Sequence, residues 1–137
     1  MRTAIDSNVF SAIWTGESTV PRLLALLAEA RQEGALLIAP FVFSELFAYP
    51  GMSENLIRGF LDATGVAVDV RLDPRVWSES GMRFARYAAR RRQSFEEGPR
   101  RLLADFLIGA HALVQADRLL TLDPKVYERD FPEVRLM

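Results

Sequence analysis

Four short apolar runs, separated by longer segments with helical periodicity, constrain the fold of this chain more than any other feature. The runs span residues 2–6, 35–39, 66–70 and 118–122. Residues 35–39 are apolar throughout, a pattern typical of a strand that a parallel sheet buries on both faces, and the other three segments indicate short buried strands that also contain Arg, Thr or Asp. Because strands alternate with helices from end to end, we expect α/β architecture with right-handed crossovers. The predicted fold is a three-layer α/β/α sandwich with a mainly parallel sheet of four strands, or of five if residues 134–136 add an edge strand.

The segments between these runs carry the capping and breaking residues of helices. Ser7 is the expected N-cap of a first helix over residues 8–15, which Gly16 ends. A second helix is expected to start at Ser18 or Thr19. Further helices are expected at residues 41–49, 53–63, 100–116 and 124–129, with a long helix opening at Asp73 and a loop at residues 93–99.

The composition limits the kinds of metal site that this chain can build. The 137 residues contain no cysteine and a single histidine, His111. Disulfides and thiolate sites are therefore excluded, and a zinc site is disfavoured, so any metal must be bound by oxygen ligands. With half of the residues apolar at this length, we expect one globular domain over residues 1–137.

No segment of the sequence predicts export or membrane insertion. The first apolar run is interrupted by Asp6, too early for the apolar core of a signal peptide. No stretch approaches the roughly 20 apolar residues that span a bilayer. We therefore expect a cytoplasmic protein without a membrane partner.

Four carboxylates are predicted to lie at one edge of the sheet. Asp6 and Asp123 stand at the carboxyl ends of the first and last runs. Glu45 lies in the helix after the second run, and Asp105 in the first turns of the helix before the last. Each alone could be an ordinary capping, turn or solvated residue, but parallel sheets bind ligands at the carboxyl ends of their strands. Carboxylates gathered there repel one another, so we expect a compensating hard cation such as Mg²⁺ or Mn²⁺ and chemistry on phosphates.

Four motifs carry a resemblance to a known family. They are IDSNVF at residues 5–10, SEL at 44–46, ADFLIGAHA at 104–112, and LTLD at 120–123 with FP at 131–132. With these motifs the chain resembles the PIN domain family over essentially its whole length, and most closely the VapC-type toxin ribonucleases of toxin–antitoxin pairs. The resemblance implies a PIN-like fold and a metal-dependent endoribonuclease. It also implies three partners: an RNA substrate, a cognate antitoxin protein and a second copy in a homodimer.

The resemblance assigns roles to seven residues. Asp6, Glu45, Asp105 and Asp123 match the acidic catalytic and metal-binding site, and Ser7, Asn8 and Thr121 match its polar supporting positions. Mg²⁺ or Mn²⁺ held by the carboxylates would polarise a phosphodiester oxygen and activate a bound water for in-line attack. Asp6 is the expected central ligand, and Glu45 is expected to bind metal or to orient water. Leu122 departs from the pattern, because relatives often carry a basic residue before the last acid.

The segment of residues 71–101 is basic, with nine arginines against four acidic residues. On its expected long helix, arginines recur at helical spacing at Arg83, Arg86, Arg90 and Arg91. These side chains could bind an RNA backbone through phosphate contacts. The alternatives are an acidic protein partner, or a charged helix face that only water covers.

Two further features are assigned to packing. His111 lies six residues beyond Asp105, roughly 240° around the helix, so we expect a surface or packing histidine and not a general base. Phe10, Ile13 and Trp14 form an apolar stripe on the first helix, for which core packing is the expectation. An interface with a second copy or an antitoxin is the alternative, since Trp and Phe are enriched at interface cores.

Other functions fit the residues less well. The main alternative, a catalytically inert PIN-like module that binds RNA or protein, would need a missing acid, and none is missing. A phosphotransferase or phosphatase with an aspartyl nucleophile usually carries Asp-x-Asp, but Asn8 stands at the second position, and Lys125 is the only lysine. A dinucleotide-binding domain is disfavoured because no glycine-rich turn follows the first run.

Overall fold

The computed structural model describes residues 1–94 and 101–137, in which four strands form one sheet. The strands are β1 (Thr3–Ile5), β2 (Leu36–Ile38), β3 (Val66–Val68) and β4 (Arg118–Leu120). All neighbours pair in parallel, in the order β3-β2-β1-β4. The predicted parallel sheet is therefore confirmed, with strands shorter than the apolar runs that predicted them.

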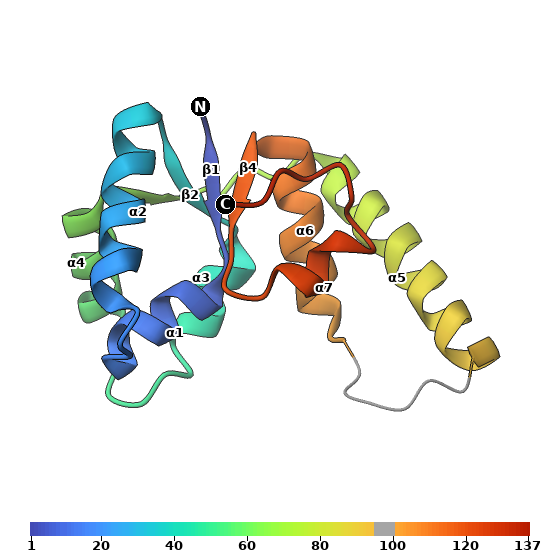
Figure 1. Cartoon of the computed structure of the whole chain (residues 1–137), viewed down its shortest axis with the longest axis horizontal. Helices are drawn as coiled ribbons and strands as arrows, with labels where there is room; N and C mark the ends of the chain where they lie inside the picture. The colour runs from blue at the N-terminus through green and yellow to red at the C-terminus, as the bar shows by residue number, and fades with distance from the viewer. Residues whose placement is uncertain (95–100) are drawn as a thin grey trace.

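Helices cover the sheet on both sides. In the described residues they are α1 (Ser7–Thr15), α2 (Val20–Glu33), α3 (Pro40–Leu46), α4 (Glu54–Thr64), α5 (Pro74–Ser94), α6 (Leu103–Gln115) and α7 (Pro124–Glu128). Figure 1 shows α2 and α4 on one side of the sheet and α5 and α6 on the other. The three-layer α/β/α fold is thus confirmed. None of the helices within residues 1–94 and 101–137 combines the length and apolarity needed to cross a bilayer.

The sheet is the centre of the hydrophobic core. Every residue of β1, β2 and β4 is buried, which explains why all of them except Thr3 and Arg118 are apolar. Ile5 and Ile38 each expose no more than 1% of their surface. Leu27 of α2 and Ile108 of α6 are also buried. Both helical layers therefore contribute apolar side chains to one core.

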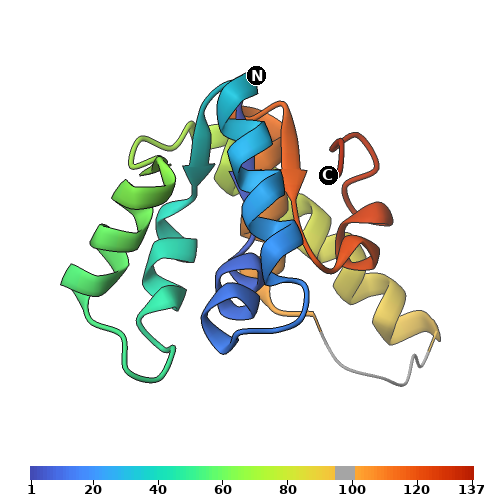
Figure 2. The same ribbon diagram turned by 60° about the vertical axis from the view of Figure 1, so that its left-hand side comes forward.

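Very short connections turn the chain at the carboxyl ends of two strands. Only Asp6 separates β1 from α1, and only Ala39 separates β2 from α3. In Figure 2 the arrowheads of β2 and β4 point toward the end of the molecule where α1 (blue) lies. Side chains from these turns can therefore meet at the edge of the sheet where the acidic residues were predicted.

Three local expectations from the sequence are corrected by the structure. Asp6 rather than Ser7 is the N-cap of α1, because Asp6 keeps an extended backbone while Ser7 is already helical. The helix expected at residues 41–49 ends at Leu46, and turns follow it. The fifth strand is reduced to an isolated parallel bridge between Leu119 and Leu136.

The region between α5 and α6 also differs from the expectation. Gln93 and Ser94, expected in a loop, continue α5, whereas residues 95–99 of that expected loop lie outside the described residues. The helix expected from residue 100 begins at Leu103, because Leu102 keeps an extended backbone as its N-cap. Residue 100 also lies outside the described residues.

Gly109 allows α6 and the segment after α7 to approach closely. A Cβ atom at position 109 would lie 2.5 Å from the ring of Phe131. Phe131 is itself only 2% exposed, so its ring has little room to move aside. The absence of a side chain at Gly109 therefore sets the distance between these two segments.

Candidate active site

Asp6 is the centre of the candidate site, where three hydroxyl groups hold its carboxylate. The residue is buried, with 5% of its surface exposed. Its Oδ2 accepts hydrogen bonds from Tyr127 Oη at 2.7 Å and from Thr121 Oγ1 at 2.9 Å. Its Oδ1 accepts a longer bond from Ser7 Oγ at 3.4 Å. A buried carboxylate needs such donors. Because they come from different parts of the folded chain, they hold the Asp6 side chain in one orientation.

Tyr127 is a site residue that the sequence reasoning missed. It lies on α7 and is 1% exposed. Burial raises the pKa of its phenol, and the charge of Asp6 and the hydrogen bond to it act in the same direction, so the phenol remains a donor. A buried tyrosine hydroxyl usually has a partner, but here the partner is 121 residues away, and no local pattern identifies it.

Glu45 reaches the same site from α3. Ser7 Oγ lies 3.0 Å from Glu45 Oε2, so its single proton stands between this carboxylate and that of Asp6. Partial burial raises the pKa of Glu45, and the charges of Asp6 and Asp105 raise it further, although the hydrogen bond from Ser7 acts in the opposite direction. Glu45 is therefore within electrostatic reach of two other acids, as the predicted clustering requires.

Asp105 lies in the first turn of α6, where its Oδ2 accepts a hydrogen bond from the Leu102 N–H at 3.4 Å. Burial raises the pKa of this carboxyl, and the charges of Asp6 and Asp123 add to the increase. The hydrogen bond from Leu102 and the nearby charge of Arg101 lower it, but the net shift is upward. The site thus contains at least two carboxyl groups whose ionisation the neighbouring acids oppose.

Asn8 and Thr121 connect the ends of β1 and β4 around Asp6. The Thr121 hydroxyl donates to Asp6 and accepts from Asn8 Nδ2 at 3.3 Å and from the Asp123 N–H at 3.1 Å. Asn8 Oδ1 in turn accepts from the Leu122 N–H at 3.2 Å. These bonds bring Asn8 and Thr121 together with Asp6, and their supporting roles stay a prediction.

Asp123 lies at the rim of the site and is exposed. It is the N-cap residue of α7, yet its carboxylate makes no capping hydrogen bond. Asp123 therefore does not make the hydrogen bond that would explain its presence as a helix cap. Its charge acts on Asp105, which places the two on the same side of the molecule.

The donor set of the site fits a hard divalent cation in its chemistry. All of the available groups are carboxylate, hydroxyl or amide oxygens, and the carboxylates oppose one another's ionisation. In the described residues, however, no three His, Asp or Glu side chains lie close enough together to hold one metal ion. Binding an ion at Asp6 would therefore require the neighbouring carboxylates to move closer to it.

Two of the four arginines predicted to contact RNA are held in ion pairs instead. Arg83 is buried and pairs with Glu79 at 3.0 Å and with Glu133 at 2.7 Å. Arg90 lies 2.5 Å from Asp130 Oδ1. Neither guanidinium is available to follow an RNA backbone without breaking these pairs.

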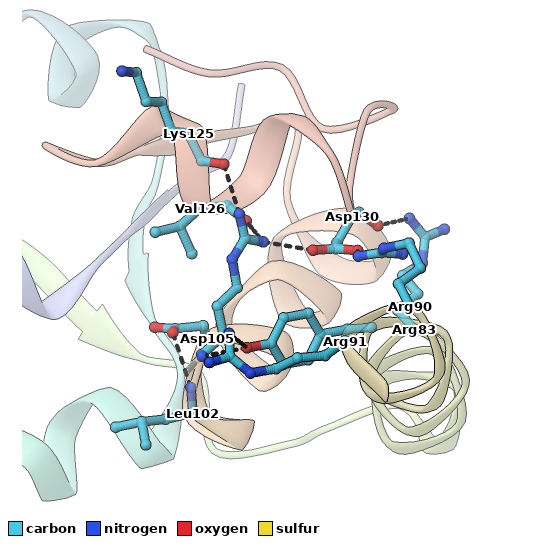
Figure 3. A network of polar contacts seen from close by, with 10 residues as sticks. Arg83, Arg90, Arg91, Leu102, Asp105, Lys125, Val126 and Asp130 are labelled. Atoms are coloured by element: carbon cyan, nitrogen blue, oxygen red, sulfur yellow. Dashed lines mark hydrogen bonds and ion pairs between the residues drawn. The ribbon is translucent and has the colours of Figure 1, made fainter. Parts of the chain in front are cut away.

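Asp130 is the centre of this arginine network, as Figure 3 shows. Its side chain is only 3% exposed, and Arg90 and Arg101 each lie 2.5 Å from one of its oxygens. Arg101 also donates to the carbonyl groups of Lys125, at 2.8 Å, and of Val126. The network therefore ties α5 and the residues before α6 to α7.

Arg86 and Arg91 differ in their environments. Arg86 is exposed, and its charge helps to lower the pKa of Glu133. Arg91 is less exposed and lies 3.4 Å from the hydroxyl of Tyr87. Of the four predicted arginines, Arg86 is thus the one whose surroundings agree best with a phosphate contact.

The two features assigned to packing are confirmed. His111 is 1% exposed, and its Nε2 lies 3.0 Å from Asp69 Oδ2, while burial lowers the pKa of its imidazole. Phe10 is completely buried, and Ile13 and Trp14 pack against the core with part of their surface exposed.

Comparisons with known proteins identify the fold and the family of this chain. The structure of VapBC2 from Rickettsia felis bound to a DNA fragment from their promoter is 18% identical to this chain, with a TM-score of 0.59; the match covers 100% of this chain and 98% of that one. VapBC-1 from nontypeable Haemophilus influenzae is 15% identical, with a TM-score of 0.66 and coverage of 100% and 97%. At these identities the likeness shows the fold. A comparison with curated proteins found no match. A model of the PIN domain matches residues 3–132, and the chain therefore belongs to the PIN domain family.

Proposed function

We propose that this protein is a metal-dependent endoribonuclease that hydrolyses RNA phosphodiester bonds. One observation carries the proposal: Asp6 is buried among neutral hydroxyl donors, with Glu45 and Asp105 close enough for the three charges to oppose one another. Such an arrangement destabilises a fold unless a cation offsets it, so it is typical of a functional site. The alternative of an inert PIN-like binding module gives these acids no role.

Each residue of the site has a role in this proposal. Mg²⁺ or Mn²⁺, held by Asp6, Asp105 and Asp123, would supply a Lewis acid for the phosphate and activate a water. Tyr127 and Thr121 hold the carboxylate of Asp6 in one orientation through their hydroxyl groups. Glu45 would bind metal or orient the attacking water.

We further propose that the protein is the toxin of a type II toxin–antitoxin pair in the cytoplasm. Its partners would be a cognate antitoxin and a second copy of this chain. The support comes from the sequence motifs and from the two similar structures, which are VapBC structures. A neighbouring small reading frame with a DNA-binding amino half would support the pairing.

Asp6→Asn tests the nuclease proposal most directly. Asparagine keeps an oxygen that can accept from Tyr127 and Thr121, so the fold should remain intact. Loss of the central charge should lower Mg²⁺- or Mn²⁺-dependent cleavage of a total RNA pool by at least about 100-fold, the upper end of what even outer groups of a metal site contribute. Asp62→Asn, on the exposed surface of α4, is the matched control and should cleave like the wild type.

Two results would contradict the nuclease proposal. One is full activity of Asp6→Asn, and the other is equal cleavage by the wild type in excess EDTA. RNA binding without cleavage at any metal concentration would favour the binding module instead.

Arg86 is proposed as a phosphate contact of the substrate. Arg86→Ala should weaken RNA binding and reduce the slope of log affinity against log salt by about 1. Binding measured by fluorescence anisotropy at several salt concentrations gives this slope. An unchanged slope would mean that Arg86 does not contact RNA and lies on a helix face that only water covers.

A further inference from the structure

A cleft of about 370 Å³ opens directly beside the acidic site. Ser7, Asn8 and Glu45, which belong to the site, also form part of its wall. Its volume lies within the roughly 300–1,000 Å³ of typical ligand sites. Because the site and the cleft share these residues, a molecule bound at the acids can reach into the cleft.

Two aromatic rings form another part of the wall. Trp14 of α1 and Tyr49, which follows α3, lie 5.4 Å apart between ring centroids, with an interplanar angle of 62°. Trp14 is supported from behind by Phe60, at 5.4 Å, and by Phe10, at 6.0 Å. Both cleft rings keep part of their surface exposed. The Trp14 ring is thus held by other aromatic rings before any ligand binds.

The charge of the cleft indicates which part of an RNA would enter it. None of its described lining residues is Lys or Arg, and Glu45 contributes a negative charge. A phosphate would be repelled there. A nucleobase is neutral and planar, so it can stack on an aromatic ring, and the exposed hydroxyl of Ser11 in the wall can hydrogen-bond to its edge.

We propose that this cleft is a base-binding subsite, in which an unpaired nucleobase next to the scissile phosphate stacks on the ring of Tyr49 and contacts Trp14, whose ring is inclined to that of Tyr49. The inference rests on the proposed function, since it requires that an RNA phosphate lies at the acidic site. A base within a duplex cannot leave its stack without losing its pairing energy. The subsite therefore selects single-stranded RNA, whereas the acids alone would not.

Kinetics of Tyr49 variants test the stacking. Tyr49→Leu keeps an apolar side chain but removes the aromatic face, and it should raise KM for a single-stranded RNA about tenfold, the lower part of the range for one stacked base. Tyr49→Phe keeps a ring and should lose markedly less. Phe47→Leu is the matched control, because Phe47 is an exposed aromatic residue of the same segment that does not line the cleft. Its KM should equal that of the wild type.

Fluorescence provides a second measurement that needs no cleavage. The chain has two tryptophans, and Trp77 is 55% exposed on α5, outside the cleft. In a Trp77→Phe background, Trp14 is the only tryptophan. With Asp6→Asn added to prevent cleavage and Mg²⁺ present to offset the remaining carboxylates, titration with short oligouridine and oligoadenosine should quench its emission, whereas the two strands annealed into a duplex should not.

The two measurements together decide the proposal. It requires both the higher KM of Tyr49→Leu and the quenching of Trp14 by single strands, and the absence of either overturns it. Quenching of Trp14 by a purified antitoxin but not by RNA also overturns it, and would assign the cleft to a protein interface. If the wild type cleaves RNA while Tyr49→Leu behaves like it, the subsite fails and the nuclease proposal stands. If the wild type cleaves no RNA, the nuclease proposal itself fails.

Discussion

Two regions of this molecule bury a carboxylate, and they differ in the charge of the groups that surround it. Asp130 is surrounded by cations, with Arg90 and Arg101 each 2.5 Å from one of its oxygens. Asp6 accepts hydrogen bonds from neutral hydroxyl groups, and its charge acts on two further acids, Glu45 and Asp105. The first arrangement neutralises the charge within the protein. The second leaves a negative charge for something outside the protein to neutralise, which is why we assign structure to one region and function to the other.

The largest effect should come from Asp130→Asn. The substitution removes the anion but leaves two guanidinium groups in place, and breaking a buried pair in this way costs about 3–5 kcal/mol. Because Arg90 and Arg101 are 31% and 21% exposed, we expect the lower end, about 3 kcal/mol. Urea denaturation measures the loss. A change below about 1 kcal/mol would mean that Asp130 is not neutralised as the structure indicates.

Asp62→Asn is the control for that measurement. It makes the same chemical change on the exposed surface of α4 and should alter the free energy of unfolding by no more than about 0.5 kcal/mol.

A smaller effect is expected from Tyr127→Phe, which removes one donor from Asp6. The carboxylate then depends on Thr121 and the longer bond from Ser7, so its orientation is less well defined. Cleavage should fall about tenfold, equivalent to about 1.4 kcal/mol, and the Mg²⁺ concentration needed for half-maximal activity should rise. Metal titrations of both proteins give these quantities. A lower rate with an unchanged metal requirement would show that Tyr127 supports the fold and not the orientation of Asp6.

The smallest effects should have opposite signs in the two regions. The pKa of Asp105 is raised in the folded protein, so its contribution to stability is present below its unfolded pKa, near 3.8, and is lost as the pH rises through the folded pKa. The pKa of Glu133 is lowered beside Arg83, so its contribution is present above its unfolded pKa, near 4.5, and is lost as the pH falls through the folded pKa.

In EDTA at pH 7, Asp105→Asn should therefore melt at a higher temperature than the wild type, and Glu133→Gln at a lower one. Each shift should be no more than about 4 °C, the change that about 1 kcal/mol gives at this chain length. Both differences should shrink as the pH falls to 4, where the wild-type carboxyl groups take up protons. Shifts of the same sign at pH 7 would contradict the conclusion that the charge of Asp105 destabilises the fold while that of Glu133 stabilises it.

The features that the sequence predicted are those that depend on local patterns. The short, mostly apolar segments that form β1, β2 and β4 predicted buried parallel strands, and the positions of Asp6 and Asp123 followed from the strand ends. Glu45 and Asp105 required the family resemblance, because their placement depends on how α3 and α6 are rotated about their axes. That rotation is set by packing against the sheet and is not encoded in the residues next to them.

The features that the sequence did not predict depend on partners far along the chain. The spacing of Arg83 and Arg90 correctly indicated one helix, but their partners Glu133 and Asp130 lie 50 and 40 residues away. The spacing of arginines on a helix cannot show whether an acidic residue from another part of the chain forms ion pairs with them. Tyr127 was missed for the same reason, since its hydroxyl donates to a residue at the opposite end of the sequence.

Because Gly109 has no side chain, α6 and the segment after α7 pack closely, and this packing connects the two regions. Asp105 lies one turn before Gly109 on α6, and Asp130 is the neighbour of Phe131, whose ring fills the space where a Cβ would be. A methyl group at position 109 would have to push α6 and the segment after α7 apart. It would thereby displace an acid of the site and strain an ion pair at once, although it touches neither. Position 109 is thus a point from which the geometry of the acids could be altered without changing any charged residue.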